Sequence, residues 1–198
     1  RRPDGGNRGM TLYHCSPEPG LKTLRPSGSR FGKPRQVCLT ASLPMALMYG
    51  VRHFEYTYGY NRAGELYYEE FFPNALAEIY RGKKASLYVC AHREDMGTTV
   101  IPNEYVTPLE VPVEEEIRIP DVYTALREQE RQGTLKVVRW EDAGAQRRAR
   151  MAEMELLTIR EQKLLEQPDA PFARYMREKY PESWARAVQD GAEKGGQV

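Results

Sequence analysis

The chain has 198 residues, of which 40% are hydrophobic and 29% charged, a composition typical of a soluble globular protein with one domain, or one domain and an appendage. A formal net charge of +1 excludes a protein-wide basic field that would steer the chain to nucleic acid or to an acidic membrane, although a local basic patch is compatible with it. No stretch of about 18 apolar residues occurs, so we expect no transmembrane helix, and no hydrophobic signal region follows the basic start.

The three cysteines, Cys15, Cys38 and Cys90, are an odd number in apolar surroundings. We expect reduced thiols and therefore a cytoplasmic protein, although export as an effector without a cleaved signal would leave the same pattern. Residues 1–9 are expected to be a disordered N-terminus or a vector-derived remnant.

The first third of the chain alternates short apolar runs with turn residues. We predict a strand over residues 10–14, a long loop rich in proline and glycine over 15–34, and a second strand over 36–40. A long loop within a compact domain is often functional. Ser42 is in the position of a helix cap, with Pro44 in the first turn, and predicts a helix over 43–54.

The middle of the chain continues the mixture of strands and helices. We predict a hairpin over 54–72, a short helix over 73–84 that Gly82 ends, and a strand over 85–93. One or two further strands follow within 98–113. A helix between its cap Asp121 and Gly133, and a last strand over 134–140, complete a domain of residues 10–140 in the α+β class.

Residues 143–190 differ from the rest because they are helical throughout. Apolar residues recur near helical spacing between charged ones, which predicts an amphipathic extension packed on the domain, or alternatively a docking surface for a partner. These residues are Met151, Met154, Leu157, Leu164 and Leu165.

Three segments carry residues suited to chemistry: YHCS at 13–16, QVCLTASLPMALMYG at 36–50, and PNEYVTPLEV at 102–111. Their order resembles the ADP-ribosyltransferase fold, in the branch with a His-Tyr-Glu triad that includes diphtheria-toxin-like enzymes and poly(ADP-ribose) polymerases. The resemblance covers residues 11–112. It implies a split antiparallel sheet with short helices, and NAD as a substrate without a metal.

The resemblance assigns a role to each segment. Glu104 would bind the ribose 2′-hydroxyl and stabilise the oxocarbenium-like sugar as nicotinamide leaves. His14 would donate a hydrogen bond to the adenine-side ribose and so orient the dinucleotide. Tyr49 would stack on the cationic nicotinamide ring. The remaining NAD-binding positions are the backbone of Cys15, together with Ser16, Thr40, Ser42 and a second stacking tyrosine, Tyr60.

Several positions depart from the family pattern. Cys15 replaces the usual glycine, so its side chain is expected to crowd the nicotinamide site, and Ala46 replaces a serine that contacts the carboxamide. The short spacing from Tyr49 to Glu104, without a regulatory helical domain, favours a single ADP-ribosyl transfer or NAD hydrolysis over polymer synthesis. The acceptor is left open between protein, nucleic acid and a small molecule. Glu110 and the run Glu114–Glu116 are rivals for the carboxylate role.

Four other interpretations stay open. A Cys/His nucleophile would combine Cys38 or Cys90 with His14, since adjacent His14 and Cys15 point to opposite faces of a strand. A metal site would use Cys90 and His92, which lack a second ligand pair. An RNA 2′-phosphotransferase-like activity would use three basic residues, His14, Arg30 and Arg35. A non-catalytic binding module would explain Cys15 and Ala46. Phosphate-binding glycine motifs are absent from the sequence.

Overall fold

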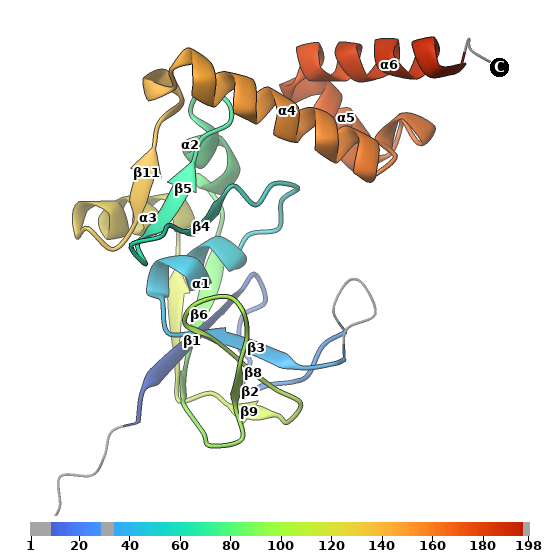
Figure 1. Cartoon of the computed structure of the whole chain (residues 1–198). Coiled ribbons are helices and arrows are strands. Elements are labelled where there is room, and N and C mark those ends of the chain that lie inside the picture. Colours follow the sequence, from blue (N-terminus) through green and yellow to red (C-terminus); the bar gives the residue numbers. More distant parts are fainter. Residues whose placement is uncertain (1–8, 29–33, 196–198) are drawn as a thin grey trace, which may run out of the picture. The chain divides into compact units, whose positions relative to one another are not determined.

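The computed structural model in Figure 1 describes residues 9–28 and 34–195, which divide into two units. The predicted disordered N-terminus, apart from Gly9, and Arg30 lie outside the described residues. One unit, here called the sheet unit, comprises Arg1–His53, Tyr58–Tyr68 and Leu76–Val137. The other, here called the helical unit, comprises Phe54–Thr57, Glu69–Ala75 and Val138–Val198.

The sheet unit is built on a six-stranded antiparallel sheet in the order β10-β6-β1-β3-β8-β7. The fold is therefore α+β, as predicted from the alternation of short strands and helices. The strands are β1 (Thr11–Ser16), β3 (Val37–Thr40), β6 (Ala85–Ala91), β7 (Gly97–Thr98), β8 (Glu104–Thr107) and β10 (Glu115–Ile119). Smaller sheets contain β2 (Thr23–Leu24) with β9 (Val111–Pro112), and β4 (Tyr58–Tyr60), β5 (Leu66–Glu69) and β11 (Lys136–Val138).

Different elements pack on the two faces of the six-stranded sheet. One face holds a core cluster contributed by β1, β3 and β6 and by the β2 and β9 strands. The members of this cluster are Leu12, Leu24, Val37, Leu39, Tyr88, Cys90, Met96 and Val111. Helix α1 (Leu43–Tyr49) packs on the opposite face, in contact with β1, β3 and β6.

Helix α1 begins and ends at residues that the sequence makes recognisable. The Ser42 side chain accepts from the Met45 N–H, and Pro44 stands in the first turn, as predicted. The helix ends at Tyr49 rather than at residue 54, and the Gly50 N–H closes its last turn on the Ala46 and Leu47 carbonyls. Helices α2 (Ala75–Tyr80) and α3 (Val122–Arg131) follow the prediction, with Asp121 as the cap of α3 and Gly133 at a φ of 80° beyond its end.

Strands β1 and β3 separate over part of their length. Strand β1 pairs with β6 at each of its six residues, whereas its pairing with β3 is at Tyr13↔Thr40. The end of β1 and the beginning of β3 therefore leave an opening in the sheet, and the candidate site surrounds it.

Strand β10 was not predicted. Its residues include Glu115 and Glu116, which the sequence presents as part of a solvated carboxylate run. Charged, outward side chains are typical of an edge strand, so the run of charges does not distinguish this strand from a solvated loop.

The helical unit contains α4 (Ala145–Glu161), α5 (Pro171–Lys179) and α6 (Pro181–Gly195), which contact one another (Figure 1). Two short 3₁₀ helices, Trp140–Asp142 and Leu164–Glu166, accompany them. The predicted helical extension is confirmed as helical. Among the described residues, no helix has the length and apolar character needed to cross a membrane.

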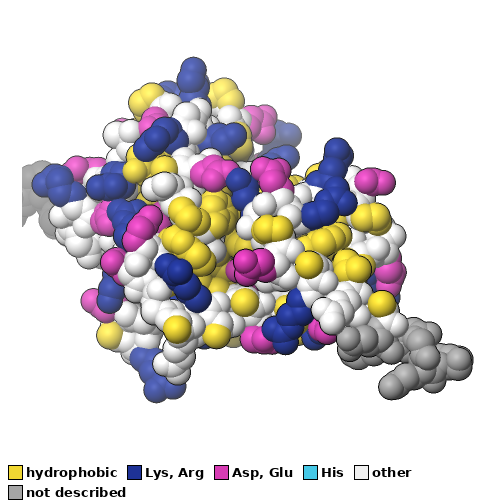
Figure 2. All heavy atoms as spheres, turned by 90° about the horizontal axis from the view of Figure 1, so that it is seen from above, with side chains coloured by type: hydrophobic (Ala, Val, Ile, Leu, Met, Phe, Trp, Pro, Cys, Tyr) yellow, Lys and Arg dark blue, Asp and Glu magenta, His cyan; other side chains and the backbone are white. Residues whose placement is uncertain are grey.

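The predicted apolar stripe of this unit is partly wrong. Met151 and Leu164 are buried, but the side chains of Met154 and Leu157 are 45% and 53% exposed. The buried face of α4 instead runs through Met151, Glu155, Leu156 and Ile159, because the helical repeat brings i, i+4 and i+8 together. The face seen in Figure 2 mixes exposed hydrophobic side chains with charges of both signs, so no single-sign field covers it.

Candidate functional site

Three neighbouring strands set the directions of the candidate residues. Tyr13 on β1 pairs with Thr40 on β3, and Thr40 pairs with Glu104 on β8. Directly paired residues project to the same face of a sheet, so Glu104 projects to the face that α1 covers. His14 alternates with Tyr13 and projects to the other face, where its ring lies 6.5 Å from that of Tyr88, its partner on β6.

Tyr49 and Glu104 meet on the α1 face. The Tyr49 hydroxyl, on the last residue of α1, lies 3.5 Å from Glu104 Oε2 and donates to it. Burial first, and then the neighbouring Glu104 charge, raise the pKa of Tyr49 above its usual range. Tyr49 is therefore a neutral phenol beside a carboxylate at neutral pH.

Two tyrosines of β4 approach the same place. Asn103 Nδ2 donates to the Tyr60 hydroxyl at 3.3 Å, one residue before Glu104. The ring of Tyr58 lies 6.0 Å from the Tyr49 ring, at an interplanar angle of 58°. Tyr60 is predicted from the sequence as a stacking residue and Tyr58 is not, although two residues of a strand at i and i+2 share a face, so the pattern Tyr-Gly-Tyr could have indicated both.

His14 bridges the opening between β1 and β3. Its Nδ1 lies 3.0 Å from the Cys38 carbonyl oxygen. A carbonyl can only accept, so Nδ1 carries the proton in this contact. Burial lowers the pKa of His14, so the ring is neutral and presents Nε2 as an acceptor. In this tautomer Nε2 is an acceptor, whereas the resemblance implies a donor.

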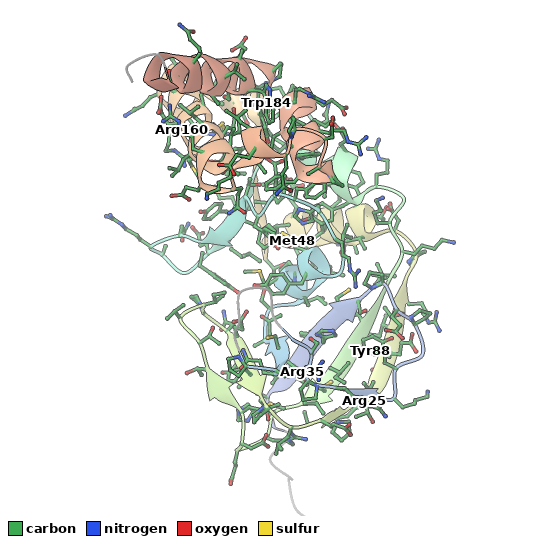
Figure 3. The ribbon with its side chains drawn as sticks, turned by 90° about the vertical axis from the view of Figure 1, so that its right-hand side faces the viewer. Arg25, Arg35, Met48, Tyr88, Arg160 and Trp184 are labelled. Atoms are coloured by element: carbon green, nitrogen blue, oxygen red, sulfur yellow. The ribbon has the colours of Figure 1, made fainter. Side chains whose placement is uncertain are left out.

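Two cavities meet at this histidine. A cavity of about 210 Å³ is lined by Tyr13, Cys15, Thr40, Ala46 and Tyr49, and one of about 590 Å³ by Ser16, Lys22, Arg25 and others. His14 and Cys38 line both. Figure 3 labels Arg25 and Tyr88 in the sheet unit; Arg25 lines the larger cavity, and Tyr88 packs beside His14. His14 thus borders both cavities.

The Cys15 side chain is turned toward α1. A Cβ placed on Gly50 would lie 2.3 Å from Cys15 Sγ, so the sulfur fills the space that this glycine leaves. Burial raises the pKa of the Cys15 thiol to about 12 and that of Cys90 to about 11. Both remain protonated at neutral pH, which disfavours either as a nucleophile. The Cys15 side chain therefore packs against Gly50 and also forms part of the wall of the smaller cavity.

The hydroxyls named for NAD binding have local structural partners. Ser16 Oγ accepts from the Glu18 N–H at 3.1 Å, and Thr40 Oγ1 accepts from the Ser42 N–H at 3.0 Å. Ser42 Oγ caps α1 by accepting from Met45 N–H at 3.4 Å. Each hydroxyl still has a proton to donate.

Two of the rival carboxylates, Glu110 and Glu116, have partners of their own. Glu116 Oε1 accepts from the Gly20 N–H at 3.0 Å and from Ser86 Oγ at 2.7 Å, and pairs with Arg118. These hydrogen bonds lower the pKa of Glu116, the one from Gly20 first. Glu110 forms an exposed ion pair with Arg25 at 3.4 Å. Glu116 thus fastens the loop after β1 to the sheet.

The surroundings of Cys90 and His92 are unlike those of a metal centre. Cys90 is fully buried in the core, and the His92 ring packs edge-on against Tyr105 at 5.2 Å. Within residues 9–28 and 34–195, no group of three or more histidine, cysteine, aspartate or glutamate residues is placed to hold a metal ion.

Comparison of the chain with models of protein families, with curated proteins and with solved structures found no match. The function of the chain is therefore inferred from the residues and geometry of the site.

Proposed function

We propose that the chain is an NAD-dependent mono-ADP-ribosyltransferase or NAD glycohydrolase with an ADP-ribosyltransferase-like split sheet. The observation that carries the proposal is the meeting of Tyr49 and Glu104 beside a cavity that also has His14 in its wall. These are the three residues that the sequence resemblance selects, and they come from three separate segments of the chain.

The chemistry of each group suits the cleavage of a nicotinamide–ribose bond. The Tyr49 ring lines the smaller cavity and offers an aromatic face to the cationic nicotinamide. Glu104, next to it, accepts from the ribose 2′-hydroxyl and stabilises positive charge on the sugar as the bond breaks. Loss of nicotinamide leaves an electrophilic sugar carbon for the acceptor or for water.

The adenosine half would occupy the larger cavity, in whose wall His14 also lies. His14 Nε2 accepts from a ribose hydroxyl there, while Nδ1 stays fixed on Cys38. Lys22 and Arg25 line this cavity and offer positive charge to the pyrophosphate.

A non-catalytic binding module is the second candidate. Two features favour it. Both oxygens of the Glu104 carboxylate already accept hydrogen bonds from protein hydroxyls, those of Tyr49 and Thr99. The methyl group of Ala46 lies in the cavity wall, where the resemblance implies a serine. Such a protein would bind NAD or a related nucleotide without cleaving it.

Nicotinamide release from NAD, measured by chromatography, tests the proposal. Removing a group that stabilises charge in a transition state costs on the order of 100- to 1000-fold in kcat, which is the loss expected for Glu104→Gln at nearly unchanged KM. Glu115→Gln, an exposed glutamate on β10, is the matched control and should keep the activity of the unaltered protein.

The outcomes separate the candidates. No nicotinamide release together with no thermal shift on adding NAD would refute the enzyme proposal. A thermal shift without release would establish the binding module. Release at equal rates in Glu104→Gln and Glu115→Gln would show that the carboxylate role is misassigned.

A further inference from the structure

Glu104 lies at the neck of a hairpin, and a threonine lies directly across it. Strands β7 and β8 pair at Gly97↔Val106 and Thr98↔Tyr105. The next positions of this register are Thr99 and Glu104, so their side chains project to the same face. Residues 100–103 form the tip, where Val100 is 99% exposed, while Thr99 and Glu104 are half-buried.

The hydrogen bonds of Thr99 have one consistent direction. Thr99 Oγ1 lies 2.8 Å from Glu104 Oε1 and 3.1 Å from the Ile101 backbone nitrogen. An N–H group can only donate, so the hydroxyl accepts from Ile101 and its single proton is directed to the carboxylate. A hydroxyl fixed in this way donates to an ionised carboxylate and does not compete with it for a proton.

We infer that Thr99 is the positioning residue of Glu104, an inference that rests on the proposed function for its effect on the reaction. Thr99 holds Oε1 at the hairpin neck and so directs Oε2 toward Tyr49, which lines the smaller cavity. A glutamate has three rotatable bonds, so a half-buried carboxylate without this contact occupies several directions. Thr99 acts on the sugar through Glu104 and touches no substrate atom.

The adjacent threonine provides a matched control. Thr98 is exposed and pairs with Tyr105, so it has the same side-chain chemistry but projects to the other face of the hairpin. Thr99→Val keeps the shape of the side chain and removes the hydroxyl, whereas Thr99→Ser keeps the hydroxyl. Thr98→Val removes a hydroxyl that does not face Glu104.

Kinetics of nicotinamide release test the role in the reaction. A hydrogen bond to a charged group that acts in the transition state corresponds to a loss of about 10- to 100-fold in kcat, expected for Thr99→Val with KM changed by less than about 2-fold. Thr99→Ser should restore kcat to within about 3-fold of the unaltered protein, and Thr98→Val should leave it unchanged. A loss in KM alone, or no rescue by serine, would overturn the inference.

A second measurement does not depend on turnover. With tyrosine labelled by ¹³C at Cζ, the NMR resonance of Tyr49, assigned by its loss in Tyr49→Phe, reports the nearby carboxylate. Its chemical shift should change in Thr99→Val and stay unchanged in Thr99→Ser and Thr98→Val. An unmoved resonance in Thr99→Val would overturn the positioning role even if NAD is cleaved. A moved resonance in a protein without nicotinamide release would support it and refute only the proposed function.

Discussion

Gly50→Ala tests how closely helix α1 packs on strand β1. The backbone of Gly50 is right-handed helical, with φ −70° and ψ −9°, so alanine fits it without strain. At such a position the substitution alone would stabilise a protein by about 0.4 to 1 kcal/mol, because it restricts the unfolded chain. An increase in stability is therefore the expectation when neighbouring atoms are ignored.

The neighbouring atoms reverse this expectation. The added Cβ would lie 2.3 Å from Cys15 Sγ, 3.0 Å from Cys15 Cβ and 3.3 Å from the Leu47 carbonyl oxygen. Cys15 cannot move aside easily, since β1 pairs with β6 along its whole length. Overpacking of this kind costs about 1 to 3 kcal/mol, so we expect a net destabilisation of roughly 1 to 2 kcal/mol, or a fall in Tm of about 2 to 8 °C.

Circular dichroism during urea unfolding measures the loss. Both tryptophans, Trp140 and Trp184, belong to the helical unit, so their fluorescence follows that unit in the same sample. Cys15→Ala combined with Gly50→Ala removes the 2.3 Å contact, and the pair should show a coupling of about 0.5 to 3 kcal/mol. Gly97→Ala is the control, because no atom lies within 4 Å of its added Cβ. An unchanged or raised stability of Gly50→Ala, or additivity with Cys15→Ala, would refute the packing argument.

Two further predictions concern a buried carboxyl and a strained residue. Burial raises the pKa of Glu155 to about 7, and Ser183 Oγ donates to it at 2.6 Å. Since the folded pKa exceeds the unfolded one, this group stabilises the helical unit below pH of about 4.5 and loses that contribution as pH rises through about 7. The free energy of unfolding, measured with urea by tryptophan fluorescence, should therefore fall by about 1 kcal/mol between pH 6 and pH 8, less than the full pKa displacement because water screens part of the group, and Glu155→Gln should abolish the fall; a fall that persists in the variant would assign it to another group. Asn103 has a φ of 62° and donates to Tyr60, so the free energy of unfolding of Asn103→Ala should be lower than that of Asn103→Gly by about 1 kcal/mol, while both lose the Tyr60 contact; equal free energies of unfolding would show that the backbone carries no strain there.

Much of the local structure could be predicted because the signals are local. The cap at Ser42, the cap at Asp121 and the glycine after α3 mark helix ends by the chemistry of single residues. Strands β1 and β3 could be predicted from apolar runs beside turn residues, whereas the short β2 lies within the predicted loop. Strand β10 was missed because its side chains are those of an edge, where charge is compatible with pairing.

The candidate site was predictable as a set of residue types and not as a geometry. His14, Tyr49 and Glu104 could be selected from their order, but the face to which each projects depends on strand register, which no single segment contains. The acceptor state of His14 depends on the Cys38 carbonyl across the opening. Thr99 was missed for the same reason, since it becomes a neighbour of Glu104 only through the hairpin register.

The division of the chain has a consequence for synthesis on the ribosome. Phe54–Thr57 and Glu69–Ala75 belong to the helical unit, yet they leave the ribosome long before Val138–Val198. Phe54 stacks on Phe172 at 5.1 Å, and Glu55 accepts from Tyr175 at 2.7 Å and from Tyr180. These early segments therefore emerge with aromatic side chains whose partners do not yet exist. The nascent chain should expose them to chaperones until Val138–Val198 has been synthesised. A truncation that removes this segment would leave these aromatic side chains permanently without their partners.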